Sequence, residues 1–230
     1  MKKATSILIS MAFILACHLN VNAQRIKGNK NVIKKHYKTE SFTGIELAGT
    51  YDVKLKKGDA FSVEIETDEN LHPLIELKVK DDILHISNKD FRNPSKLIAY
   101  ISMPELTYVN ASGASSMEGQ ATFRAESFKL IASGASDVFL SLETTLIETE
   151  LSGAADVELK GIAKEHIVEA SGASSLNAEN FITDYTDINC SGAASATVNA
   201  VKELRGDSEG AGSIEIVQEP EILKINRGST

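Results

Sequence analysis

The feature that most constrains the fold is a short motif, Ser-Gly-Ala followed by Ser or Ala, that recurs through the second half of the chain. The five clear copies and one degenerate copy occupy residues 112–115, 133–136, 152–155, 171–174, 191–194 and 209–212. Successive glycines are separated by 21, 19, 19, 20 and 18 residues. A period of about twenty residues indicates a repeat architecture in which each repeat is one unit stacked on the next.

Apolar residues alternate with polar ones on both sides of each glycine. Around Gly134, for example, Leu130 and Ala132 precede the glycine and Val138 and Leu140 follow it, at spacing two. Alternation at spacing two is typical of β-strands with one buried face. Each repeat therefore predicts two strands joined by a short corner.

Glycine suits such a corner because it adopts positive φ without steric cost. If the repeats lie directly above one another, about 4.8 Å apart, each corner side chain meets its own copy, and only small residues fit. The period and the corners predict a single-stranded parallel β-helix with coils of about twenty residues. The signature of leucine-rich repeats is missing, and a propeller blade needs about twice this period. The predicted corner ladder consists of Ser112, Gly113, Ser133, Gly134, Ser152, Gly153, Ser171, Gly172, Ser191, Gly192 and Gly210.

The first half of the chain is also rich in alternating segments, without the Ser-Gly-Ala tag. These segments are 42–47, 51–55, 61–65, 75–79, 83–86 and 97–101, with turns at Gly49 and at Lys57-Gly58-Asp59 among others. The short spacing between 51–55 and 61–65 predicts antiparallel hairpins, and residues 69–72 predict one helical turn before Pro73. We expect this hairpin-rich region to cap one end of the β-helix, because a bare terminal coil exposes unpaired strand edges.

The N-terminus predicts export. Lys2 and Lys3 precede an apolar run that is too short to span a bilayer, and Val21-Asn22-Ala23 suits a signal peptidase. Residues 1–23 are therefore interpreted as a signal peptide, residues 24–40 as a flexible basic leader, and residues 41–228 as a single domain. In an alternative interpretation, Ile14-Leu15-Ala16-Cys17 is a lipoprotein box and Cys17 carries a lipid anchor.

Composition excludes some classes of partner. The formal net charge is −8, and this acidic balance argues against nucleic acid, because a phosphate-binding surface needs clustered Lys and Arg. No phosphate loop, dinucleotide fingerprint or metal-ligand cluster occurs, and we expect no cofactor and no metal. Cys190 lies between apolar and small residues and is predicted to be buried.

The segment Ser41 to Leu55, which reads SFTGIELAGTYDVKL, is similar to the opening of the head GIN domain family, labelled as auto-transporter adhesins of exported Bacteroidetes-type proteins. The resemblance continues through 82–86 and the Ser-Gly-Ala repeats and covers residues 40–228. It implies a right-handed, pectate-lyase-like β-helix with a β-rich start. It implies no particular molecular function.

Candidate functional residues are scattered. The repeated serines lack the Gly-x-Ser-x-Gly elbow, and stacking explains them better than catalysis. Asp137 and Asp156 occupy the same register on adjacent coils, in line with Ser116 and Ser175. They are interpreted either as solvated corner acids or as ligands that share a calcium ion. Outward carboxylates for glycoside hydrolysis or for calcium are Glu148, Glu150, Glu158, Glu169 and Asp187. Tyr100, Tyr108 and Tyr185 are candidate sugar-stacking platforms, and His166 occupies a core position between coils.

Three functional hypotheses follow. The first is a non-enzymatic exported module, periplasmic or on the cell surface, that binds a glycan or a protein on its extended β-surface. The second is a polysaccharide lyase or glycoside hydrolase on the same scaffold. The third is an envelope structural protein that self-associates through its open coil ends.

Overall fold

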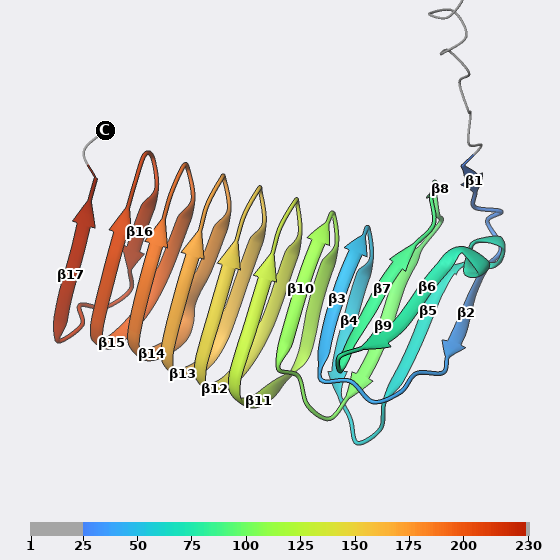
Figure 1. The fold of residues 1–230 in the computed structure, drawn as a ribbon, viewed down its shortest axis with the longest axis horizontal. Coiled ribbons are helices and arrows are strands. Elements are labelled where there is room, and N and C mark those ends of the chain that lie inside the picture. The colour runs from blue at the N-terminus through green and yellow to red at the C-terminus, as the bar shows by residue number, and fades with distance from the viewer. Residues whose placement is uncertain (1–24, 229–230) are drawn as a thin grey trace, which may run out of the picture.

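In the computed structural model, which describes residues 25–228, flattened β-coils stack along the long axis of the molecule (Figure 1). The coils form a parallel β-solenoid of about six turns, which confirms the predicted parallel β-helix. The strands of the repeat region are β10 (Tyr108–Gly113), β11 (Ser116–Ala132), β12 (Asp137–Leu151), β13 (Asp156–Ala170), β14 (Ser175–Cys190), β15 (Ser195–Ser208), β16 (Ser213–Ile216) and β17 (Ile222–Arg227). Each of these strands pairs in parallel with its neighbours.

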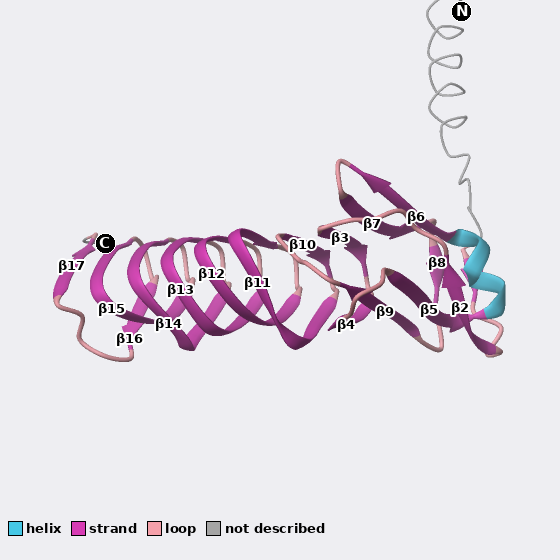
Figure 2. Cartoon of the chain, turned by 90° about the horizontal axis from the view of Figure 1, so that it is seen from below, coloured by secondary structure: helices cyan, strands magenta, loops and turns pink. Residues whose placement is uncertain are grey.

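Each long strand bends near its middle and so supplies both sides of its coil (Figure 2). In β12, Val138 and Leu140 point inward before the bend, and Ile147 and Leu151 point inward after it. Inward residues of adjacent coils stand in register, so the apolar core runs as columns along the axis. Burial of these side chains is the main force that holds the coils together.

The solenoid begins earlier in the chain than the Ser-Gly-Ala motif. Strands β3 (Gly44–Gly49) and β4 (Asp52–Lys57) form the first coil, with Gly49 in register with Gly113. The chain then leaves the solenoid to build a cap and returns at β10, which pairs in parallel with β3. The cap contains β5 (Ser62–Asp68), the 3₁₀ helix η1 (Glu69–Leu74), β6 (Ile75–Lys80), β7 (Ile83–Asn88), β8 (Phe91–Arg92) and β9 (Leu97–Met103).

The cap corrects part of the hairpin prediction. β6 and β7 do form an antiparallel hairpin, and η1 confirms the predicted helical turn. Strand β4, however, does not pair with β5. It lies parallel to β9 and β11, because its inward residues Val53 and Leu55 stack on the solenoid core. β5 instead pairs antiparallel with β9.

The basic segment 24–40 also differs from the flexible leader expected. Strand β1 (Ile26–Lys27) pairs with β8, and β2 (Val32–Tyr37) lies antiparallel to β5 as an edge strand. Most side chains of β2, including Lys34, Lys35 and His36, are exposed along this sheet edge. The predicted signal peptide 1–23 and Cys17 lie outside the described residues.

Asp68 fastens the N-terminal segment to the cap. Its fully buried carboxylate accepts hydrogen bonds from the backbone N–H groups of Lys30 (2.5 Å) and Ser95 (2.6 Å) and from the Ser95 hydroxyl (3.0 Å). Burial alone would raise the pKa of Asp68, but these hydrogen bonds outweigh it and the pKa is lowered.

Across residues 25–228, no helix has the length and apolar character needed to cross a bilayer.

Candidate functional site

The corner glycines lie in one column along the molecule. A Cβ added to Gly134 would lie 2.5 Å from the carbonyl oxygen of Gly113, and one added to Gly153 would lie 2.7 Å from that of Gly134. The residue after each glycine donates to the glycine carbonyl of the previous coil, as Ala135 N does to Gly113 O at 2.7 Å. Each glycine of the column has a positive φ; the column consists of Gly49, Gly113, Gly134, Gly153, Gly172, Gly192 and Gly210.

Several serines of the corner motif form hydrogen bonds from their hydroxyls to backbone carbonyls. The hydroxyl of Ser112 donates to the carbonyl of Leu47 at 2.7 Å, and that of Ser171 donates to Leu151 at 3.2 Å. The second serine of the motif is buried, and at Ser174 its hydroxyl donates to the carbonyl of Ser171 at 2.9 Å. These hydroxyls hold the corners in shape and are not arranged as nucleophiles. Ser133, Ser152 and Ser191 occupy the equivalent positions on their own coils.

Asp137 and Asp156 are direct register partners, flanked in the same row by Ser116 and Ser175. The row lies on the outside of the solenoid, next to the corners. Within residues 25–228, no three His, Cys, Asp or Glu side chains gather in a way that suits a metal ion. In this row Asp156 is exposed, and Asp137, Ser116 and Ser175 are partly exposed.

The outward carboxylates are divided between two sides of the solenoid. Glu158 precedes the bend of its coil, whereas Glu148, Glu150, Glu169 and Asp187 follow the bend of theirs. Glu150 and Glu169 are register partners and line a cavity of about 310 Å³. Lys129 lies 2.6 Å from Glu150 and 3.7 Å from Glu148, and its hydrogen bond with Glu150 raises the pKa of Lys129. Glu150 thus belongs to an ion pair, whereas glycoside hydrolysis needs a protonated acid opposite a second carboxylate.

The three candidate tyrosines do not share a surface. The Tyr185 side chain is 40% exposed on β14, with the Lys202 ammonium 5.7 Å from its ring. The Tyr100 hydroxyl donates to Glu66 at 2.8 Å, and the Lys34 ammonium lies 3.5 Å from its ring centroid. Tyr108 is half-buried where β10 meets β3.

His166 and Cys190 belong to the core. His166 is 1% exposed and stands in register between Ile147 and Thr186, which confirms its predicted core position. Its Nε2 lies 2.9 Å from the hydroxyl of Thr149, and burial lowers its pKa to about 3. Cys190 is fully buried, and desolvation raises the pKa of its thiol to about 11, so it is not a reactive nucleophile.

A surface groove lies on the side of the solenoid that carries Glu158, before the bend of the coils. It is not among the sites predicted from the sequence. Its volume is about 390 Å³, and we call it the Phe139 groove; it is lined by Ser116, Glu118, Gly119, Phe139, Leu140, Ser141, Glu158 and Lys160. It arises from the coil of β11, where three residues between Glu118 and Thr122 face one residue of β12. The two extra residues form a bulge that bends the strand locally.

An aromatic ring between two carboxylates forms the floor of this groove. Phe139 is 42% exposed and stands in register with Glu118 on one side and Glu158 on the other. Lys54 lies 2.5 Å from Glu118, and Lys160 lies 2.7 Å from Glu158. The hydrogen bond with Glu118 raises the pKa of Lys54, so the Lys54 ammonium stays charged at neutral pH. The 21-residue step from Gly113 to Gly134, two longer than the next, is the sequence signal of the bulge.

Comparison with known proteins locates relatives of the same architecture. Residues 41–220 match the family described as "Putative auto-transporter adhesin, head GIN domain". A crystal structure of a "putative adhesin" from Bacteroides fragilis has a TM-score of 0.83 at 22% identity, covering 88% of this chain and 95% of that one. A "putative adhesin" from Parabacteroides merdae has a TM-score of 0.69 at 21% identity, with coverages of 89% and 98%.

A third structure, a "putative lipid binding protein" from Parabacteroides distasonis, has a TM-score of 0.65 at 17% identity, covering 90% of this chain and all of that one. At these identities the structural likeness establishes the fold alone. No curated protein matches the chain. The family match extends from the first coil of the solenoid to the loop before its last strand. The chain therefore belongs to the family described as "Putative auto-transporter adhesin, head GIN domain".

Proposed function

We propose that the protein is an exported, non-enzymatic binding module of adhesion type that holds a neutral glycan in the Phe139 groove. The observation that carries the proposal is the exposed Phe139 ring at the floor of a concave site, with Glu118 and Glu158 on either side. An aromatic face packs well against the C–H face of a sugar ring, and carboxylates accept hydrogen bonds from hydroxyl groups. The groove volume suits one or two sugar units.

The family description supports an adhesion role, and the signal sequence expected at residues 1–23 supports export. The two lysine–glutamate ion pairs support binding rather than hydrolysis, because each carboxylate contacts a lysine ammonium, whereas glycoside hydrolysis needs one carboxyl group free to protonate the leaving group. The Parabacteroides distasonis relative is described as binding lipid. A groove bordered by Glu118, Glu158 and Lys160 is less suited to an acyl chain than to a sugar.

The experiment is a glycan array probed with the exported protein, followed by titration calorimetry on the ligands found. Phe139→Ala should weaken binding about tenfold, equivalent to about 1.4 kcal/mol, whereas Phe139→Tyr should retain it. Tyr185→Ala is the matched control, because it removes an aromatic side chain of similar exposure on another part of the surface. Absence of any glycan ligand, or equal affinity of the Phe139→Ala variant, would show that the proposal is wrong.

A further inference from the structure

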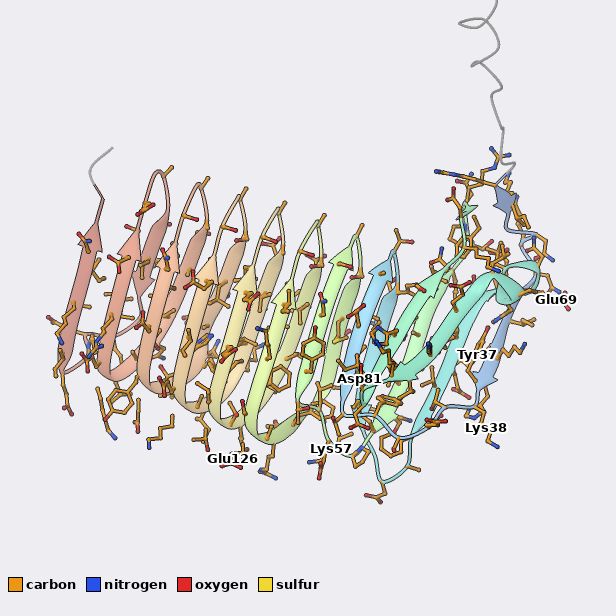
Figure 3. All side chains as sticks on the ribbon, in the orientation of Figure 1. Tyr37, Lys38, Lys57, Glu69, Asp81 and Glu126 are labelled. Carbon is orange, nitrogen blue, oxygen red and sulfur yellow. The ribbon has the colours of Figure 1, made fainter. Side chains whose placement is uncertain are left out.

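Two segments at opposite ends of the molecule carry opposite charge, although the whole chain is acidic. The segment from Arg25 to Lys38 contains no acidic residue and six basic ones. The basic residues are Arg25, Lys27, Lys30, Lys34, Lys35 and Lys38. This segment contains β1 and β2 and lies at the cap end of the molecule, where Figure 3 shows Tyr37 and Lys38. Lys35 and Lys38 are exposed. Arg25 is paired with Asp90 at 2.7 Å, and Lys34 lies 3.8 Å from Glu64 within the same chain. The exposed Lys35 and Lys38 leave the β2 edge basic.

The opposite end is acidic. The segment from Gly206 to Leu223 contains no Lys or Arg and five acidic residues. The acidic residues are Asp207, Glu209, Glu215, Glu219 and Glu221. Glu219 and Glu221 are exposed on the loop between β16 and β17, the last two strands of the solenoid. The one ammonium on the adjoining part of β17, Lys224, is paired with Glu203 at 2.9 Å within the same chain. The loop charge is therefore available to a partner.

Both ends also leave strand edges free within the described part of the chain. β2 pairs there only with β5, and β16 and β17 pair only with β15. Apolar side chains are exposed beside these edges. Leu223 is 43% exposed, although its register partner Leu204 is fully buried in the preceding coil. At the cap end, Ile33 on β2 is 37% exposed.

We propose that copies of this chain associate head to tail, with the basic β2 edge of one molecule docked on the acidic terminal coil of the next. The charges are complementary between the two ends but not between two copies of the same end. A tail-to-tail pair would bring like charges together, whereas head-to-tail contact pairs lysines with glutamates and covers Leu223. Such a contact is heterologous, so it repeats along the axis and forms short filaments rather than closed dimers. The proposal is independent of the ligand in the Phe139 groove.

Sedimentation velocity of the exported protein tests the proposal. The mean mass should rise with protein concentration beyond that of a dimer at low salt, and it should fall in 1 M salt, where the Debye length is about 3 Å. A monomer at every concentration, or a closed dimer, would overturn head-to-tail association. An assembly that is unchanged in 1 M salt would also contradict it, because the contact between the ends depends on their charge.

Charge reversal adds a structural check. Lys35→Glu with Lys38→Glu at one end, or Glu219→Lys with Glu221→Lys at the other, should each lower the association constant at least tenfold. Mixing the two reversed variants should restore filaments in which the two proteins alternate, because one contact joins their two unmodified ends and the next joins their two reversed ends, which again carry opposite charge. A chain carrying all four reversals should associate again, because its ends are complementary with opposite sign. Lys56→Glu with Lys164→Glu is the control for the Lys35 and Lys38 reversal; it makes the same change in net charge at exposed sites away from β2 and from the terminal coil. Failure of the four-fold variant to recover would contradict the proposal.

Discussion

At the corner of each coil, a single missing side chain allows the coils to approach. Gly134 has a φ of 75°, a left-handed backbone that costs a residue with a Cβ about 1–2 kcal/mol. The added Cβ would also lie 2.5 Å from the Gly113 carbonyl oxygen, which is backbone and cannot easily move aside. The corner therefore combines a conformational and a steric requirement for glycine.

Gly134→Ala should lower the free energy of unfolding by at least about 2 kcal/mol, since the steric term adds to the backbone term. Denaturant titration followed by circular dichroism measures the change. Ala135→Ser is the control at the neighbouring corner position, where the side chain is exposed, and it should be close to neutral. Equal stability of the Gly134→Ala variant and the wild type would show that the corner column does not depend on close stacking.

His166 makes the stability of the fold depend on pH. Its pKa is about 3 in the folded protein, because burial disfavours the imidazolium, and about 6.5 when unfolded. Below pH 6.5 the unfolded state therefore binds a proton that the folded state does not, and stability decreases as pH falls from 6.5 towards 3. The neutral imidazole is fully compatible with the core above pH 6.5.

The free energy of unfolding should fall by about 2 kcal/mol between pH 7 and pH 5. His166→Gln should remove most of this decrease, because the amide does not titrate and can still form a hydrogen bond with Thr149. His36→Gln, on the exposed strand β2, should leave the pH dependence unchanged. Chemical denaturation at the two pH values measures all three proteins. A pH dependence that persists in the His166→Gln variant would assign the effect to other groups.

At the scale of the strand, the bulge in β11 creates the proposed binding site. The register offset between β11 and β12 is 21 residues at Glu118–Phe139 and 19 residues at Thr122–Ser141. Deleting Gln120 and Ala121 makes the spacing 19 throughout, which is the spacing of β12 and β13. The deletion lies beyond the paired part of β4, which ends where Leu55 faces Gly119.

The deletion variant should keep the fold and lose the Phe139 groove. We expect its melting temperature to change by only a few degrees and its glycan affinity to fall at least tenfold, because a regular strand closes the space beside Phe139. Differential scanning calorimetry and binding titration measure the two quantities. Undiminished affinity in a folded deletion variant would place the glycan elsewhere on the molecule.

Most of the solenoid could be predicted from the sequence because its repeats are adjacent and nearly identical. The first coil could not, although Gly49 is flanked by Ile45, Leu47, Val53 and Leu55 at the same offsets as the later glycines. The cap inserted between Gly49 and Gly113 interrupts the period, and Thr50-Tyr51 replaces the small residues of the motif. Pairing across such an insertion depends on tertiary contacts, which local periodicity does not contain.

The Phe139 groove could not be predicted from the sequence for a different reason. The unequal glycine steps correspond to register shifts between β11 and β12, between β13 and β14, and between β14 and β15, so the irregularity is present in the sequence. The sequence does not show where in the coil the irregularity lies, because the coil can accommodate an extra residue at the corner, at the bend or in a strand. Strand β2 was missed for a related reason: its lysines resemble a solvated leader until β5 supplies a pairing partner.

For the whole molecule, stacking of identical coils implies that stability is transmitted between neighbours. In a solenoid each coil contacts only the next ones, and an end coil has one neighbour instead of two. The cap covers the first coil through β7 and β9, whereas β16 and β17 pair only with β15 among the described strands (Figure 1). The two ends should therefore differ in local stability.

Hydrogen exchange at low protein concentration should show protection that is high in β11 to β14 and falls through β15 to β17, while β3 and β4 stay as protected as the central coils. The reason is that opening the last coil breaks one set of interstrand hydrogen bonds, whereas opening the first coil must also displace the cap. Raising the concentration at low salt should increase protection selectively in β16, β17 and β2, because head-to-tail contact would bury these edges. Uniform protection along the solenoid would contradict the nearest-neighbour picture, and a concentration effect confined to other strands would contradict the proposed contact.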